Sequence, residues 1–350
     1  MVTDRQRVLV YCANGFQGHA IIAELLRSGW RVRALVRDKA RAAPLAAAGA
    51  EVCPADLDDA ASLRKAHQDA DVAVVQLPSG VAPDQTLIQA GNAMAAIRSS
   101  GITNVVLNSS VNFPSRSREL PQFAARQQAE QQVLGSSPQV SVIRAPFLLS
   151  NLLLPWASQS VAVRGVLAYP VAADVPLCWA APEDVGQLVS LVIREQFYGH
   201  TLYAGARKAL RGEELANAFS RALNRIIRYQ AMPLDDFEAG VDAAISPGAG
   251  KQIGAIFRFI ERHPDDRAFV STPFRAPAGF PSFEPTGETE WVSAHADAFS
   301  QASVGRARAS SPSLTAKPVP GQPPAAEAGR AWRERRLRFG ARILTDERGR

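Results

Sequence analysis

Short apolar runs alternate with stretches of helical spacing from the start of the chain to about residue 144. Each apolar run is short and nearly unbroken, which is typical of a strand buried on both faces of a sheet. Between these runs apolar residues recur on one side of a helix, as Ile21, Ile22 and Leu25 do, and a glycine often ends the stretch. The pattern predicts strands at residues 7–13, 31–37, 51–56, 72–77, 105–110 and 140–144, and helices at residues 19–28, 40–48, 59–68, 84–100 and 123–134.

Strands that alternate with helices form a parallel sheet with helices on both faces. We therefore expect an α/β chain whose residues 1–150 form a doubly wound, parallel-sheet Rossmann fold. The alternation loosens after Pro146. Residues 151–300 are expected to form a smaller α+β substrate-capping region, interwoven with the first and lying over the sheet edge where such folds bind ligands. Its predicted elements are helices at residues 182–194, with Asp184 in the first turn, and 211–223, and strands at residues 201–204 and 226–230.

The basic charge of the chain is concentrated in its last fifty residues. Residues 301–350 hold eleven Arg or Lys and four acids, so they carry +7, whereas residues 1–300 carry −1 of the net +6. This tail is rich in Pro and Ser, which predicts disorder over residues 301–329 and at most a short basic helix over residues 330–343. Contact with nucleic acid is expected only through this tail.

Composition favours an ordinary globular protein outside any membrane, with 47% hydrophobic and 21% charged residues. Three scattered cysteines and the lack of a separate apolar leader before the first strand predict a cytoplasmic location. No group of histidines and acids has the spacing of metal ligands, so we expect no metal.

A glycine-containing turn joins the first strand to the first helix. Gly15 is expected to supply the unusual backbone angles of the turn, and Gly18 to let the helix pack close to the strand. The N–H groups at the helix start would then bind a pyrophosphate. In the nucleotide-binding pattern Gly-x-x-Gly-x-x-Gly, Cys12 stands at the first glycine. The alternative is therefore a turn that no longer binds a nucleotide. The cofactor-binding candidates here are Cys12, Asn14, Gly15, Phe16, Gln17 and Gly18.

Arg37 ends the second strand, where an acid would bind the ribose of NAD and an arginine the 2′-phosphate of NADP. We therefore expect NADP rather than NAD. The alternative is that Arg37 is a solvated loop charge.

These segments resemble the NmrA-like family of atypical short-chain dehydrogenases/reductases, over residues 7–300. The similar stretches are residues 8–18, 32–38, 55–57, 123–130, 143–151, 210–216 and 285–291. The resemblance implies that Arg37 contacts the 2′-phosphate, that Asp56 and Leu57 flank the adenine, and that Arg126 stands at a family lysine. Leu77, at the end of the fourth strand, completes the cofactor candidates. Phe147 and Asn151 lie in the segment that leads into the substrate region.

The usual proton relay of short-chain dehydrogenases, Tyr-x-x-x-Lys, is missing. No tyrosine occurs between Tyr11 and Tyr169, and no lysine between Lys65 and Lys208. Arg126 can bind as a fixed cation but cannot act as a general acid. The remaining catalytic candidates are Asn108 and Ser109, with Ser110 beside them at the end of the fifth strand. The alternative is a polar strand end whose side chains hydrogen-bond to the backbone.

Two hypotheses follow from the resemblance, since the family includes both NADPH-dependent reductases and NADP-binding regulators. The first is an NADPH-dependent oxidoreductase of a quinone-like or conjugated carbonyl small-molecule substrate. The second is a non-catalytic NADP(H) sensor that acts through a protein partner. We favour the first, because the loss of the relay residues does not remove hydride chemistry.

Overall fold

The computed structural model describes residues 6–137, 139–244 and 247–300, all within the compact unit Met1–Val304. The predictions for the tail, disorder over residues 301–329 and a basic helix over residues 330–343, fall outside the described residues. None of the described helices is long and apolar enough to cross a membrane.

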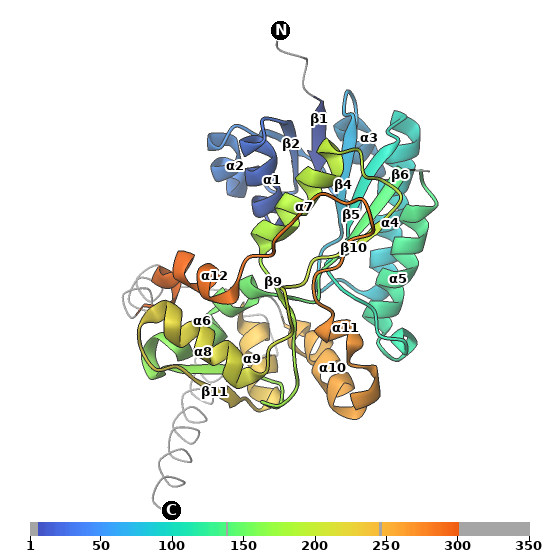
Figure 1. Ribbon diagram of the computed structural model, residues 1–350. Coiled ribbons are helices and arrows are strands. Elements are labelled where there is room, and N and C mark those ends of the chain that lie inside the picture. The colour runs from blue at the N-terminus through green and yellow to red at the C-terminus, as the bar shows by residue number, and fades with distance from the viewer. Residues whose placement is uncertain (1–5, 138, 245–246, 301–350) are drawn as a thin grey trace, which may run out of the picture. The chain divides into compact units, whose positions relative to one another are not determined.

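Seven strands of the described chain form one parallel sheet, in the order β10-β6-β5-β4-β1-β2-β3 (Figure 1). Every neighbouring pair in it is parallel. From β1 the chain adds strands toward one edge of the sheet up to β3, and from β4 it adds them toward the other edge. Ligands bind beyond the carboxyl ends of the strands at such a switch point. The strands are β1 (Arg7–Val10), β2 (Arg31–Val36), β3 (Glu51–Pro54), β4 (Val72–Gln76), β5 (Asn104–Asn108), β6 (Gln139–Arg144) and β10 (Thr201–Tyr203).

Helices cover both faces of the sheet, because alternate residues of each strand point to opposite faces. Val8 and Val10 of β1 share one apolar core with α1 and α7, whereas Leu9 of β1 shares another with α3, α4 and α5. These cores confirm the doubly wound fold. The helices are α1 (Phe16–Arg27), α2 (Ala43–Ala47), α3 (Ala60–Ala66), α4 (Pro83–Ser100), α5 (Pro121–Leu134) and α7 (Pro182–Arg194).

The strand predicted at residues 201–204 belongs to this sheet and does not lie in the cap. It pairs with β6, Leu202 opposite Ile143. The preceding helix, α7, packs against α1 so closely that a Cβ on Gly186 would lie 2.8 Å from the Ala20 carbonyl oxygen. Hydrophobic periodicity predicts a strand but not its partner, so it could not assign this strand to the sheet.

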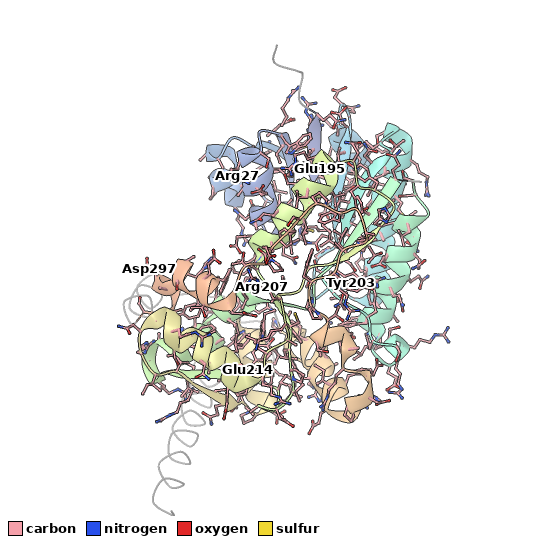
Figure 2. All side chains as sticks on the ribbon, in the orientation of Figure 1. Arg27, Glu195, Tyr203, Arg207, Glu214 and Asp297 are labelled. Atoms are coloured by element: carbon pink, nitrogen blue, oxygen red, sulfur yellow. The ribbon has the colours of Figure 1, made fainter. Side chains whose placement is uncertain are left out.

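A second, helical layer with its own core lies beyond the carboxyl ends of the strands (Figure 1). Two short parallel pairs, β7 with β9 and β8 with β11, form separate two-stranded sheets. Glu214, labelled in Figure 2, lies at the start of α8. It accepts the Arg211 N–H at 2.9 Å and pairs with Lys208 at 2.9 Å. The elements are β7 (Phe147–Leu148), α6 (Pro155–Arg164), β8 (Val166–Tyr169), β9 (Trp179–Ala180), α8 (Gly212–Leu223), β11 (Arg228–Ala231), α9 (Leu234–Ala244), α10 (Ala249–Arg262), α11 (Ala268–Ser271) and α12 (Glu288–Ala294).

Asp184 lies in the first turn of α7, as predicted, but it is buried. Its carboxylate accepts hydrogen bonds from the Thr286 N–H at 2.9 Å and hydroxyl at 2.5 Å. Burial raises the pKa of Asp184 to about 6, because desolvation penalises the charged form more than these bonds favour it.

Candidate functional site

The turn between β1 and α1 has a backbone different from the one expected. Gly15 is in an ordinary extended conformation, with φ −82° and ψ 163°, whereas Cys12 has φ +48°. The left-handed residue is therefore Cys12, and the expectation for Gly15 was wrong. A side chain at positive φ is strained by about 1 kcal/mol, which explains why related turns place glycine there.

Gly18 has the predicted packing role. A Cβ at this position would lie 2.4 Å from the Cys12 carbonyl oxygen and 2.7 Å from that of Ala13. The helix start thus sits directly against the turn. Gly15 is the N-cap residue of α1, and no described side chain makes a capping hydrogen bond there. The first turn of α1 carries no acid. Its free N–H groups and positive dipole fit a pyrophosphate.

The thiol of Cys12 is directed to the neighbouring strand. Its Sγ donates to the carbonyl oxygen of Gln76, at the end of β4, at 3.3 Å. Burial raises the pKa of Cys12 to about 11, although Arg126 and Arg37 oppose this shift. Desolvation thus outweighs both positive charges, and the turn does not activate this thiol.

The remaining cofactor candidates lie along the same carboxyl edge of the sheet. Arg37 follows β2 and is exposed, with no hydrogen bond or ion pair to any described residue. Asn14 reaches the Asp38 carbonyl oxygen at 3.4 Å. Leu57 and Leu77, which follow β3 and β4, are buried in one apolar core. Asp56 caps its own loop by accepting the Asp58 N–H at 3.0 Å.

A chain of three amide side chains crosses the ends of β1, β4 and β5. Gln76 donates to the Tyr11 carbonyl oxygen at 2.9 Å and accepts from Asn108 at 2.9 Å. Asn108 also donates to Gln17 at 2.8 Å, and Gln17 donates to the Ser110 hydroxyl oxygen at 3.0 Å. The backbone carbonyl at one end only accepts, so it fixes the orientation of every amide in turn. The Ser110 hydroxyl proton is therefore free to point away from the chain.

Gln76 is the member that the sequence analysis missed. It ends an otherwise apolar run, Val-Ala-Val-Val-Gln, and it is only 4% exposed. A polar residue at the carboxyl end of a buried strand was the available signal, because buried polar groups need partners.

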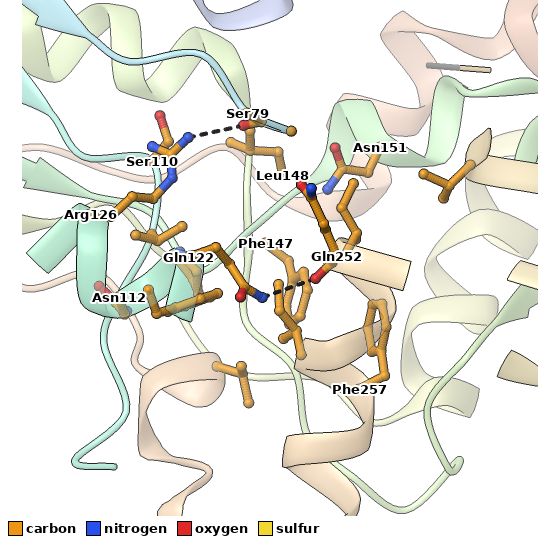
Figure 3. Close-up of a pocket in the computed structure, with 18 of the residues that line it drawn as sticks. Ser79, Ser110, Asn112, Gln122, Arg126, Phe147, Leu148, Asn151, Gln252 and Phe257 are labelled. Carbon is orange, nitrogen blue, oxygen red and sulfur yellow. Dashed lines mark hydrogen bonds between the residues drawn. The ribbon is translucent and has the colours of Figure 1, made fainter. Parts of the chain in front are cut away.

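A cavity of about 250 Å³ opens between these strand ends and the helical layer. Among the candidates, Gln17, Arg126, Phe147 and Asn151 line it, and so does Ser110. Figure 3 shows Arg126, Gln122 and Asn112 on one side of the cavity, with Asn151 and Phe257 on the other.

Two of the catalytic candidates do not reach the cavity. Asn108 and Ser109 are 1% and 6% exposed and are absent from its lining. Ser110, and not Ser109, lines the cavity. The chain turns at this point, where Ser110 has a φ of +59°. Backbone strain of this kind is often found where a side chain must face a ligand.

Arg126 is held at the cavity wall by the segment after β4. Its Nη2 donates to the carbonyl oxygen of Pro78 at 2.6 Å and lies 3.4 Å from that of Leu77 and 3.5 Å from the Ser79 hydroxyl (Figure 3). Burial lowers the pKa of Arg126. Within the described residues no carboxylate pairs with this guanidinium, so the wall carries an uncompensated positive charge.

Aromatic rings form much of the opposite wall. Phe147 stacks on Phe257 with centroids 5.9 Å apart and an interplanar angle of 10°. Tyr169 and Phe237 meet Phe257 edge to face. Gln122 donates to the Gln252 carbonyl oxygen at 2.9 Å and ties α5 to α10 across the cavity (Figure 3). The cavity thus suits a flat apolar ligand.

Comparison with known proteins agrees with this architecture. The sequence model of the NmrA-like family matches residues 4–285. The chain is 26% identical over 230 residues to an NAD(P)H azoreductase of Xenophilus azovorans, covering 65% of this chain and 78% of that protein.

Two solved structures have the same fold. The triphenylmethane reductase of Citrobacter sp. complexed with NADP(H) is 17% identical, with a TM-score of 0.63, over 82% of this chain and 99% of that one. An NADPH-dependent quinone oxidoreductase of Escherichia coli complexed with NADPH is 21% identical, with a TM-score of 0.60, over the same shares.

Proposed function

The chain belongs to the NmrA-like family, and on that basis we propose that it is an NADPH-dependent oxidoreductase of a quinone-like or other conjugated carbonyl substrate. It works without the Tyr-x-x-x-Lys pair. The similar proteins named above include an azoreductase, a triphenylmethane reductase and a quinone oxidoreductase, and their names or complexes specify NAD(P)H, NADP(H) and NADPH.

The first step of the proposal is cofactor binding at the carboxyl edge of the sheet. The uncapped start of α1 would bind the pyrophosphate, with Gly18 allowing the close approach. Arg37 would pair with the 2′-phosphate, since its exposed guanidinium has no partner among the described residues. Asp56, Leu57 and Leu77 would flank the adenine and ribose side.

The observation that carries the proposal is the oriented amide chain that ends at Ser110. Because Gln17 donates to the Ser110 oxygen, the hydroxyl proton remains available to a substrate oxygen in the cavity. When bound, the reduced nicotinamide supplies a hydride, and a carbonyl that accepts it becomes negatively charged. Ser110 would donate a hydrogen bond to that oxygen, and the nearby positive charge of Arg126 would stabilise it.

A direct test measures NADPH and NADH affinity and then follows NADPH absorbance with a panel of quinones. We expect tighter binding of NADPH and its oxidation by at least one quinone. Tight NADPH binding with no oxidation by any acceptor would reject the reductase and favour the NADP(H) sensor with a protein partner.

Adjacent serines provide matched variants for this assay. Ser110→Ala should lower kcat by about 10²–10³-fold, the usual effect of losing one donor to a developing oxyanion. Ser109→Ala should have little effect, because Ser109 does not line the cavity. Equal losses in the two variants would contradict the role of Ser110.

We also propose a cytoplasmic location. It is supported by three cysteines that are all free thiols in the structure, which suits a reducing compartment. Cell fractionation with an antibody to the chain tests this directly, and recovery with a secreted or membrane fraction would reject it.

A further inference from the structure

The charge of the cavity is one-sided. Of its described lining residues only Arg126 is charged, and none is acidic. Two acids on neighbouring elements form ion pairs with other arginines. Glu238 on α9 pairs with Arg258 at 2.6 Å, and Glu130 on α5 pairs with Arg144. A ligand in the cavity therefore meets a positive charge that no acid of the lining offsets.

Asn112 is a polar side chain of the lining that has no partner among the described residues. Asn112 is 4% exposed, and neither its Oδ1 nor its Nδ2 has a hydrogen bond to a described residue. A buried amide with both groups unpaired costs free energy that a hydrophobic residue of similar size would avoid. Nε1 of Trp156, another residue of the lining, is also buried and unpaired within the described part of the chain. These groups would gain partners from a ligand that carries polar substituents.

We propose that the cavity selects flat aromatic acceptors by charge, preferring anionic over cationic ones, with Arg126 attracting the negative substituent and Asn112 hydrogen-bonding to the ligand. This inference rests on the proposed function for its substrate class. It extends that function by naming the charge of the substrate and the two residues that recognise it.

The preference is measured with three 1,4-naphthoquinones of matched ring system. One carries an ethyl side chain, the second a sulfonate at the end of that chain, and the third a trimethylammonium group at the same place. Calorimetric titration of the full-length protein with NADP⁺ present gives each Kd without turnover. We expect the sulfonate to bind at least about tenfold more tightly than the trimethylammonium compound, with the neutral quinone between them.

Variants of Arg126 assign the source of the preference. Arg126→Gln should bring the sulfonate and trimethylammonium Kd values within about twofold of each other, whereas Arg126→Lys should retain the order. Retention of the full preference in Arg126→Gln would overturn the assignment.

Variants of unpaired polar residues test Asn112. Asn112→Leu should raise Tm, because it removes two unsatisfied groups, and should weaken quinone binding about tenfold. Ser150→Ala is the matched control, since Ser150 is 2% exposed with an unpaired hydroxyl but does not line the cavity. It should leave quinone binding unchanged. Unchanged binding in Asn112→Leu would overturn the role of Asn112.

The outcomes separate the two proposals. If no quinone oxidises NADPH but the sulfonate still binds preferentially, the reductase fails and the charge selectivity stands. If quinones are reduced but the cationic one binds as tightly as the anionic one, the reductase stands and the selectivity is refuted.

Discussion

The orientation of the amide chain can be reversed by a change of one functional group. Nδ2 of Asn108 donates to both Gln17 and Gln76, while its Oδ1 accepts the Ser110 N–H at 3.2 Å. Asn108→Asp replaces the amide nitrogen that donates to Gln17 and Gln76 with a carboxylate oxygen, which only accepts. It keeps the bond from the Ser110 N–H. The amide of Gln17 would then turn over and offer its oxygen to Ser110, so that the hydroxyl proton points inward.

The magnitude follows from which bonds can be restored. Gln17 recovers a bond by turning over, but Gln76 cannot, because its oxygen would then face the carbonyl oxygen of Tyr11. One buried bond is lost, so we expect a loss of stability of about 1–3 kcal/mol. Activity should fall by about 10²–10³-fold, as in Ser110→Ala, because the cavity loses the same donor.

The assay is kcat for NADPH oxidation with 1,4-naphthoquinone, with Tm and NADPH Kd as checks on folding and cofactor binding. The double variant of Asn108→Asp and Ser110→Ala should be no slower than either single variant, since both remove one donor. Asn104→Asp makes the same change at the start of β5, away from the cavity, and should be active. Multiplicative losses in the double variant, or full activity in Asn108→Asp, would refute the reasoning.

Three further outcomes are expected. Cys12→Gly should be more stable than Cys12→Ala by about 1 kcal/mol, because only glycine relieves the positive φ, and equal urea midpoints would contradict this. The pKa of Asp184 rises from 3.8 to about 6 on folding, so its contribution to stability is full below about pH 3.8 and is lost as the pH rises through 6. Relative to Asp184→Asn, the wild type should thus lose up to about 3 kcal/mol between about pH 4 and pH 7, whereas a constant difference in urea unfolding would disprove the shift. Arg37→Ser should weaken NADPH but not NADH binding by at least about tenfold in calorimetry, and Lys39→Ser serves as the control that should do neither.

The sequence predicted the first six strands of the sheet and the helices between them because burial on both faces leaves a strong pattern of short apolar runs. The role of Gly18 could also be predicted locally, since the close approach of a helix to a turn permits no side chain. Gly15 could not, because sequence does not show which residue of a turn takes the positive φ. Here Cys12 does so against its own preference, which only the backbone reveals.

The cavity was harder to predict because its walls come from segments far apart in the chain. Phe147 and Asn151 were identified through family resemblance, but Phe257 and Trp156 have the same apolar character as any core residue. Asn112 gave no signal at all, since an asparagine in a loop is common. The side-chain amide of Asn112 has no hydrogen-bond partner among the described residues. Only the fold shows this.

The close contact between Gly186 and Ala20 has a consequence for exchanging parts between relatives. Helix α7, which packs against α1, follows the first part of the cap in the sequence, and the seventh strand of the sheet follows α7. A fragment ending at residue 150 would remove the packing of α7 on Ala20 and Glu24 of α1 and would lack one edge of the sheet. A new substrate specificity is therefore better introduced by replacing short segments on either side of α7 than by swapping everything beyond residue 150 as a cassette.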